Sequence, residues 1–286
     1  MLRAPGLSSG VHDWWEDGAV GLTLGKYEAL GNDFLCVIDP GRSGRFDADL
    51  ARSLCDRRRG VGADGLLRVS VTGNELAMEL LNADGSAAET SGNGLRCCVL
   101  AALHAGLVPP GTARLAVHTA VGRVEAVVHA SDEGGRGEIE VGMGELAVQA
   151  LADSPVTGRR ALFVDVGNPH LVLLDEGAPV PVDLTERGPA LEASRPGGVN
   201  VEVVDVLDAT HCRLSVYERG AGLTLACGSG SCAAAAAGRA LGRLGDEVSV
   251  ENPGGSLTVR LSGPLEHPSA SLRGPARRVA RIEVAP

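Results

Sequence analysis

The stretch that decides the fold is residues 225–238, LACGSGSCAAAAAG, in which Cys227 precedes a Gly-Ser-Gly turn and a run of small apolar residues. This pattern predicts a helix that begins just after Cys227 and is buried all round, because it is apolar on every side. Backbone N–H groups at a helix start lack intrahelical partners, and the helix dipole favours negative charge there. We therefore expect a reactive Cys227 with its thiolate favoured over its thiol, and N–H groups able to hold a substrate carboxylate.

A second stretch, TSGNGLRCCV at residues 90–99, has the same form. When Ser91 is placed over Cys227, the glycines at 92 and 94 fall on those at 228 and 230. The same offset of 136 residues matches further pairs: Gly31 with Gly167, Asn32 with Asn168, Asp47 with Asp183, and Arg59 with Arg195. One offset that holds without a gap for about sixty residues predicts a duplicated half and two similar domains. The alternative is a pair of unrelated glycine-rich helix starts.

Composition excludes several classes of protein. The 286 residues are enough for two domains, and a net charge of −10 provides no basic surface for nucleic acid. No apolar run approaches the length of a membrane span. The seven cysteines are odd in number and form no C-x-x-C pair, which argues against a disulfide framework or a zinc site and for a reducing compartment.

The chain begins with an extension, residues 1–21, that contains both tryptophans and lacks the features of a signal peptide. It could be a tail, a small cap, or the product of a start site placed too early. Order is expected from residue 22, with alternating strands, a helix over 47–57 begun by Asp47, and a first central helix over 92–105. In the second half we expect a short helix over 189–193, the second central helix after Cys227, and strand pairs from 248 onward.

Two buried helices whose starts face one cleft would form a symmetrical clamp. A carboxylate between them would be held by both sets of N–H groups, and these donors would stabilise the negative charge that it takes up. The residue at the head of each helix would then stand on opposite sides of the neighbouring carbon. This geometry suits removal of an α-proton from one face and its return on the other.

These motifs resemble those of the diaminopimelate epimerase family, within the cofactor-independent proline racemase and diaminopimelate epimerase superfamily. The resemblance runs from about residue 24 to the C-terminus. It rests on seven motifs in order: GNDF at 31–34, NADGS at 82–86, GNG at 92–94, GNPH at 167–170, GVN at 198–200, ERGAG at 218–222 and ACGSG at 226–230.

The resemblance implies roles for individual residues. Cys227 would be one of two acid/base residues, with Ser91 in the position of the other, and His170 and Glu218 would lie beside the bases and tune them. The residues expected to hold the reacting carboxylate are Gly92, Asn93, Gly228 and Ser229, with Asn32 nearby. Those expected to hold the far amino acid end are Asn82, Asn168, Asn200 and Arg219, the last paired with its carboxylate.

The resemblance also implies an α/β fold of two pseudo-symmetric domains, each a curved, barrel-like sheet around a central helix, with the active site in the cleft between them. The expected N-terminal domain is 22–133 plus about 274–286, and the C-terminal domain is 134–273. Neither cofactor nor metal is expected, and the expected partner is a small amino acid substrate rather than nucleic acid or membrane. A cytoplasmic homodimer in the pathway to lysine and peptidoglycan precursors is implied.

Three departures cluster at the helix starts. The family has cysteine where this chain has Ser91, a more apolar residue at Thr90, and commonly glutamate at Leu223. A serine hydroxyl is far less acidic than a thiol, whose unperturbed pKa is about 8.5, so the usual two-thiol reaction should be impaired. The serine is compatible with natural divergence and with an introduced change.

Three functions follow from these observations. The first is epimerisation of LL- and meso-diaminopimelate or a close relative. The second is a related reaction, elimination or double-bond migration, that uses the single thiolate of Cys227. Hydroxyproline dehydratases of the superfamily are similar in carrying a hydroxyl residue in place of one cysteine. The third is a binding protein that has kept the clamp and lost turnover.

Overall fold

The computed structural model describes residues 22–88, 91–132, 134–177 and 180–284. The expected extension, with its two tryptophans, and Thr90 lie outside the described residues. Contacts divide the chain into two compact units, and the boundaries fall after Val141 and after Gly274. Unit 1 takes in the chain before Gly142 and from Pro275 onward, and unit 2 is Gly142–Gly274.

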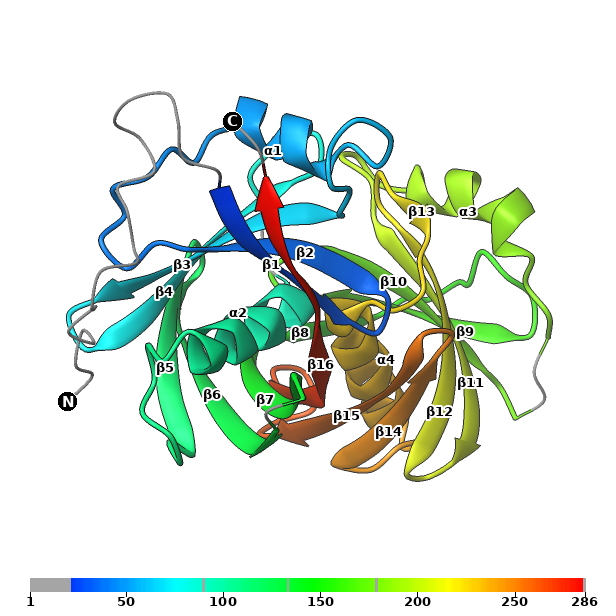
Figure 1. Cartoon of the computed structure of the whole chain (residues 1–286). Helices are drawn as coiled ribbons and strands as arrows, with labels where there is room; N and C mark the ends of the chain where they lie inside the picture. The colour runs from blue at the N-terminus through cyan, green and yellow to red at the C-terminus, as the bar shows by residue number, and fades with distance from the viewer. Residues whose placement is uncertain (1–21, 89–90, 133, 178–179, 285–286) are drawn as a thin grey trace. The chain divides into compact units, whose positions relative to one another are not determined.

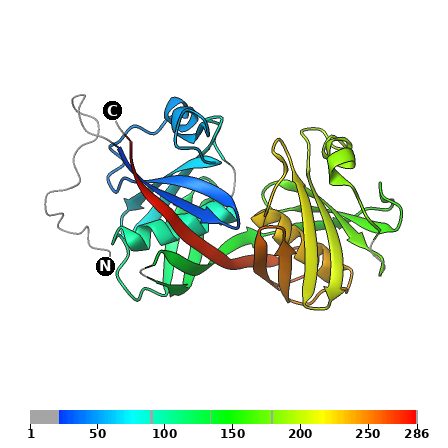
Figure 2. The same cartoon turned by 45° about the vertical axis from the view of Figure 1, so that its right-hand side comes forward.

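Unit 1 is a sheet closed on itself. Its strands follow one another in sequence order, and β16 is bonded to both β7 and β1, which completes the circle. The strands are β1 (Leu22–Ala29), β2 (Asn32–Ile38), β3 (Gly65–Thr72), β4 (Glu75–Asn82), β5 (Arg114–Thr119), β6 (Gly122–Ser131), β7 (Arg136–Glu145) and the second part of β16 (Ser269–Val284). The pairing of β16 with β1 brings the end of the described chain beside its beginning (Figure 2).

One helix fills the inside of this sheet. Helix α2 (Gly92–His104) packs against β1, β2, β3 and β4 and lies within its unit (Figure 1). Its residues from Gly92 to Ala102 are all buried, as the apolar sequence predicts. The shorter α1 (Ala48–Cys55) contacts β3 and β4 and begins at Asp47, whose Oδ1 accepts a hydrogen bond of 2.9 Å from the N–H of Leu50.

Unit 2 also has its strands arranged around one central helix. Its strand order is β8-β9-β10-β11-β12-β14-β15-β16, with the short β13 bonded to β12. The bounds are β8 (Ala147–Ala150), β9 (Arg159–Asp165), β10 (Pro169–Asp175), β11 (Asn200–Asp208), β12 (His211–Glu218), β13 (Gly222–Leu223), β14 (Glu247–Asn252) and β15 (Gly255–Ser262). Helix α4 (Gly228–Ala240) packs against β8–β12, β14 and β15, and its residues from Gly228 to Gly238 are buried.

The predicted repeat is confirmed by the elements themselves. Helices α2 and α4 each have 13 residues, and their first residues, Gly92 and Gly228, are separated by the predicted offset of 136 residues. The same offset places β4 on β12 from end to end. The pairing pattern also repeats, because β2 with β3 and β10 with β11 are both parallel. Gly31 and Gly167, which open the second strand of each repeat, have φ of 88° and 90°, a region that favours glycine. The α/β fold of two barrel-like repeats around central helices is therefore correct.

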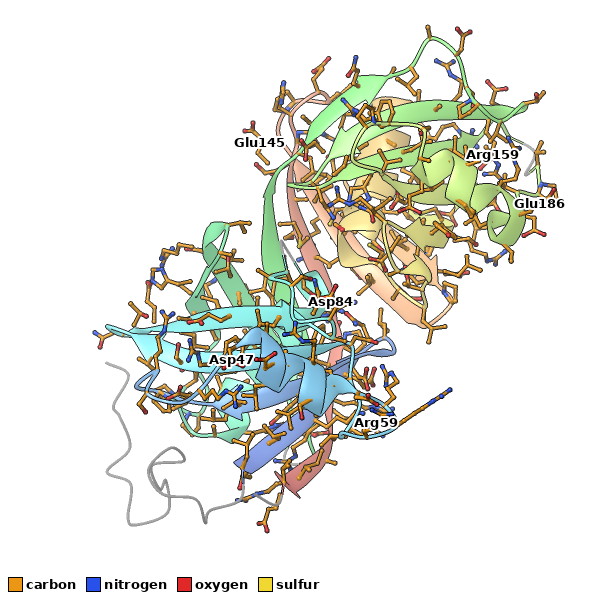
Figure 3. All side chains as sticks on the ribbon, turned by 90° about the horizontal axis from the view of Figure 1, so that it is seen from above. Asp47, Arg59, Asp84, Glu145, Arg159 and Glu186 are labelled. Atoms are coloured by element: carbon orange, nitrogen blue, oxygen red, sulfur yellow. The ribbon has the colours of Figure 1, made fainter. Side chains whose placement is uncertain are left out.

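One helix differs from its sequence-based prediction. The short helix expected over 189–193 is α3 (Leu184–Glu192), which begins five residues earlier, directly after the N-cap Asp183. Pro189 lies inside this helix and does not start it. The repeat contained the correct N-cap signal, since Asp183 is the counterpart of Asp47, the N-cap of α1. Figure 3 labels Asp47 at α1 and Glu186 at α3. No helix in the described residues is long and apolar enough to cross a membrane.

Unit 2 is stabilised by a buried arginine that the sequence does not single out. Arg159, labelled in Figure 3, is 2 % exposed and donates hydrogen bonds to the carbonyl oxygens of Val180, Leu173 and Val204. It also pairs with Asp205 at 2.6 Å. The guanidinium thus satisfies main-chain acceptors of three separate segments.

Replacing Arg159 by methionine is expected to lower the free energy of unfolding by roughly 2–4 kcal/mol, because three carbonyl groups and a carboxylate lose their donor. Urea unfolding measures this change. The neighbouring Arg160 is exposed, so Arg160→Met should change stability by no more than about 0.5 kcal/mol. Equal effects of the two substitutions would show that the buried contacts are not stabilising.

Candidate active site

Cys227 is the N-cap of α4, as the sequence predicts. Its backbone is extended, with φ of −122° and ψ of 116°, and its Sγ accepts a hydrogen bond of 3.3 Å from the N–H of Gly230. The first intrahelical bond runs from Ser231 to the Cys227 carbonyl, so the N–H groups of Gly228 and Ser229 precede the helical pattern. The helix start therefore presents a thiol beside two backbone donors.

Ser91 has the same place at the start of α2. Its Oγ accepts a hydrogen bond of 2.9 Å from the N–H of Gly94, and Leu95 donates the first intrahelical bond to its carbonyl. The N–H groups of Gly92 and Asn93 precede that bond. Serine and cysteine thus both cap a helix here, although only cysteine offers an ionisable thiol.

The cap of α4 is supported from outside the helix. The side chain of Asn252 accepts a bond of 3.4 Å from the N–H of Cys227 and donates one of 3.2 Å to Ser231 Oγ. Ser231 Oγ in turn donates to the Cys227 carbonyl at 2.8 Å. Asn252 was not among the residues predicted from the sequence, although it begins an Asn-Pro-Gly-Gly stretch at 252–255 that is typical of a turn.

The N–H of Gly230 at the helix start lowers the pKa of Cys227, as predicted, but the predicted net preference for the thiolate is wrong. Burial raises the pKa of the Cys227 thiol well above its ordinary value, and the negative charges of Glu218 and Glu202 add to the rise. Hydrogen bonds from Ser229 and Gly230 oppose it and are outweighed. The cysteine is 5 % exposed, and desolvation disfavours the charged form of a buried acid.

Neutralising a neighbouring carboxylate should therefore make Cys227 easier to ionise. Because a negative charge raises the pKa of a thiol, Glu218→Gln should lower it, and alkylation of Cys227 should reach half its maximal rate at a lower pH. Mass spectrometry of peptides after iodoacetamide treatment measures this rate for Cys227 alone. Glu251→Gln, which neutralises a carboxylate beside Cys212 instead, should leave the Cys227 profile where it is. An unchanged profile in Glu218→Gln would remove Glu218 as a determinant of this thiol.

The predicted site residue His170 has a buried ion-pair partner, Glu202. The side chains of His170 and Glu202 are both 0 % exposed, and His170 Nδ1 lies 2.7 Å from Glu202 Oε1. On the other side of the ring, Nε2 lies 2.9 Å from Asn168 Oδ1. Burial raises the pKa of the Glu202 carboxyl, repulsion by Glu218 adds to the rise, and His170 opposes it.

Glu218, the last residue of β12, and Arg219, the residue after it, are also held in place. Glu218 Oε1 accepts a hydrogen bond of 2.5 Å from Thr224. The side chain of Asn200 accepts from the N–H of Arg219 at 3.0 Å and donates to the Pro169 carbonyl at 3.1 Å. Asn200 therefore ties the segment of Arg219 to the start of β10, next to Asn168.

In unit 1 an unbroken series of side-chain hydrogen bonds leads to Asn32. Arg96, 0 % exposed, donates to Asn93 Oδ1 at 2.7 Å, and Asn93 Nδ2 donates to Asn32 Oδ1 at 3.2 Å. Asn32 Nδ2 then donates to Asp64 Oδ2 at 2.8 Å. The predicted pair Asn32 and Asn93 is thus brought together at the start of α2.

The structure gathers the predicted site residues in two sets, one in each unit. The set in unit 1 is Asn32, Ser91, Gly92 and Asn93, and that in unit 2 is Asn168, His170, Asn200, Glu218, Arg219, Cys227, Gly228 and Ser229. Asn82 is the last residue of β4, and its Nδ2 donates to Ser86 at 3.0 Å. In the described residues, no three His, Cys, Asp or Glu side chains are grouped to hold a metal ion.

Glu202 is the most informative residue that sequence reasoning missed. It lies within the apolar strand sequence VEVV at 201–204 and is fully buried. A charged residue in such a strand needs a buried partner, and this signal was available. Its identity as the partner of His170 depends on the register of β10 and β11, in which His170 lies beside Asn200.

Comparison with known proteins agrees with this geometry. The family model described as diaminopimelate epimerase matches residues 25–148 and 162–279. A diaminopimelate epimerase of Synechococcus sp. (strain JA-2-3B'a(2-13)) is 36% identical over 280 residues, covering 90% of this chain and 96% of the relative. That of Alkalilimnicola ehrlichii (strain ATCC BAA-1101 / DSM 17681 / MLHE-1) is 37% identical over 279 residues, covering 91% and 97%.

Solved structures share the fold at low sequence identity. A phenazine biosynthesis protein of the PhzF family from Bacillus anthracis has a TM-score of 0.73 at 16% identity, covering 93% of this chain and 99% of its own. A hydroxyproline epimerase from Agrobacterium vitis has a TM-score of 0.65 at 18% identity, covering 93% and 91%.

Proposed function

Because the chain belongs to the diaminopimelate epimerase family, we propose that it is an isomerase that interconverts LL- and meso-diaminopimelate. The observation that carries this function is the pair of equivalent helix starts. Each combines a cap side chain with two backbone N–H groups that precede the first intrahelical bond.

The proposed reaction begins with the substrate's reacting carboxylate. The N–H groups of Gly92, Asn93, Gly228 and Ser229 would hold it and stabilise the charge that it takes up when the α-proton leaves. Cys227 would remove that proton from one face. The pKa of its thiol is raised by burial, so its thiolate, once formed, is a stronger base, which suits a weakly acidic α-proton.

A second group of donors would hold the far end of the substrate. Arg219 would pair with its carboxylate, and Asn168, Asn200 and Asn82 would supply amide groups beside it. Asn200 Oδ1 already accepts from the N–H of Arg219, and one hydrogen of its amide is donated to the Pro169 carbonyl. Its remaining amide hydrogen is a donor, as a carboxylate requires.

Ser91 would cap the start of α2 but would be a much weaker acid/base group than Cys227. Its hydroxyl caps α2 as a thiol would, but a hydroxyl cannot supply the second thiolate. We propose slow inversion, in which the thiolate of Cys227 takes the α-proton and the hydroxyl of Ser91 donates a proton to the opposite face of the α-carbon. Solvent then returns a proton to the Ser91 alkoxide and takes up the one held by Cys227. We also propose a place in lysine biosynthesis, a cytoplasmic location and a homodimer, in keeping with the family.

Incubation with LL-diaminopimelate, followed by chromatography that separates the isomers, tests the function. The meso isomer is expected to appear. Ammonia, loss of water or a new alkene instead would identify an elimination or double-bond migration, and the proposal would be wrong. Binding of diaminopimelate without any product, in the unaltered chain and in Ser91→Cys alike, would equally overturn it.

A further inference from the structure

Two asparagines related by the repeat are each held by their carbonyl oxygen. In unit 1, Asn32 Oδ1 accepts from Asn93, which accepts from the buried Arg96. In unit 2, the equivalent Asn168 has its Oδ1 2.9 Å from His170 Nε2, and His170 Nδ1 faces Glu202. The two units thus use different buried charged residues, Arg96 and Glu202, at the far end of a similar series of contacts.

The orientation of Asn168 depends on which ring nitrogens of His170 carry hydrogen. If Nε2 carries one, it donates to Asn168 Oδ1, and the amide NH₂ of Asn168 turns away from the ring. If Nε2 carries none, it must accept from the amide NH₂, and the amide is reversed. The oxygen and nitrogen of an amide have almost the same shape, so hydrogen bonding alone decides between these two states.

Burial of Glu202 decides the matter. A neutral His170 with its hydrogen on Nδ1 would leave Glu202 ionised at 0 % exposure, with Glu218 close enough to add repulsion. One Glu202 oxygen, Oε2, is buried and has no hydrogen-bond partner in the described part of the chain. An uncompensated buried carboxylate of this kind is costly.

One further hydrogen shared between Glu202 Oε1 and His170 Nδ1 removes that cost. The pair is then neutral in sum, either as carboxylate and imidazolium or as carboxyl and imidazole. In both forms the shared hydrogen lies between Glu202 Oε1 and His170 Nδ1, and Nε2 carries a hydrogen of its own. Both forms therefore direct the Nε2 hydrogen to Asn168 Oδ1.

We propose that Glu202 is a positioning residue that acts through His170 to fix the amide of Asn168 with its NH₂ group directed toward the substrate. The amide then offers only hydrogen-bond donors, and the group that fits it is a carboxylate. This inference rests on the proposed function for the role of Asn168 in binding the far carboxylate of diaminopimelate. The orientation of the amide itself does not depend on that function.

The hydrogen on His170 can be observed directly. In the full chain labelled with ¹⁵N, two-bond ¹H–¹⁵N correlation spectra at neutral pH should show His170 Nε2 as a protonated nitrogen, assigned by its loss in His170→Phe. Glu202→Gln should keep that hydrogen, because the glutamine amide can donate to Nδ1. A wild-type Nε2 without hydrogen would overturn the proposal, whatever the chain binds.

A double-mutant cycle tests the link to Asn168. Glu202→Leu, which removes any partner of Nδ1, should weaken diaminopimelate binding about tenfold, the range of one hydrogen bond to a charged group, and Glu202→Gln by no more than about threefold. In Asn168→Ala, the further change Glu202→Leu should cost nothing more, because the amide that it positions is gone. Losses that multiply would mean that Glu202 acts on stability alone.

A matched control separates positioning from general destabilisation. Asp175 is 1 % exposed, lies at the other end of β10 and pairs with Arg243. Asp175→Asn should lower stability and leave affinity within about twofold, since surface and core changes outside the site act through folding. If Glu202→Leu does not fold, the affinity of Glu202→Gln and the His170 spectrum of the unaltered chain still test whether Glu202 positions Asn168 through His170. If the unaltered chain does not bind diaminopimelate, the proposed function fails while the His170 spectrum continues to test this inference.

Discussion

Exchanging Ser91 for cysteine is expected to raise the rate of LL-to-meso inversion by about 10²–10⁴-fold, the usual contribution of a positioned acid/base group. The substitution places a thiol at the start of α2, where the present hydroxyl already accepts from Gly94. The cap geometry of Cys227 shows that a thiol fits this arrangement. Initial rates of isomer interconversion, measured by chromatography, test the expectation.

The control for this substitution adds a thiol elsewhere in the same unit. Ser53 is exposed on α1, so Ser53→Cys should leave the inversion rate unchanged. A similar gain from both variants would mean that the added thiol acts without being positioned. No gain from Ser91→Cys would show that Ser91 does not stand where the second acid/base group is needed.

The second large effect is expected from Cys227→Ser made in the Ser91→Cys background. Inversion should fall by about 10²–10⁴-fold, because a hydroxyl cannot supply the thiolate. Folding should survive, since Ser91 shows that serine caps the equivalent helix. A midpoint of urea unfolding close to that of the parent would separate loss of chemistry from loss of structure.

Cys232 provides the matched cysteine for this experiment. It lies in the same helix and is 0 % exposed. Cys232→Ala should lower stability by about 1 kcal/mol through the cavity that it leaves and retain the inversion rate. If Cys232→Ala abolished inversion as fully as Cys227→Ser, the special role assigned to the first cysteine would be lost.

The repeat was readable from the sequence because its signals are local. A cap residue, glycines at fixed spacing and an apolar run need no knowledge of distant contacts, and they located both central helices and their starts. The same signal could have placed α3, since Asp183 repeats Asp47. The proline at 189 drew the prediction away from it, because proline is disfavoured inside a helix, yet Pro189 lies inside α3.

What the sequence could not provide is the environment of the reactive groups. A helix start lowers the pKa of a thiol, but for Cys227 the rise caused by burial and two carboxylates is larger than this lowering. Both carboxylates reach the thiol through strand pairing, Glu202 from β11 and Glu218 from β12. The sign of the net effect therefore depends on long-range contacts that no spacing rule contains.

The most direct test of the account is solvent deuterium labelling of diaminopimelate, followed by ¹H NMR in D₂O. Loss of the α-proton signal is expected with the chain as it stands, faster labelling with Ser91→Cys, and none with Cys227→Ser. Labelling that persists unchanged in Cys227→Ser, or no labelling by either the unaltered chain or Ser91→Cys, would contradict the claim that Cys227 removes the α-proton.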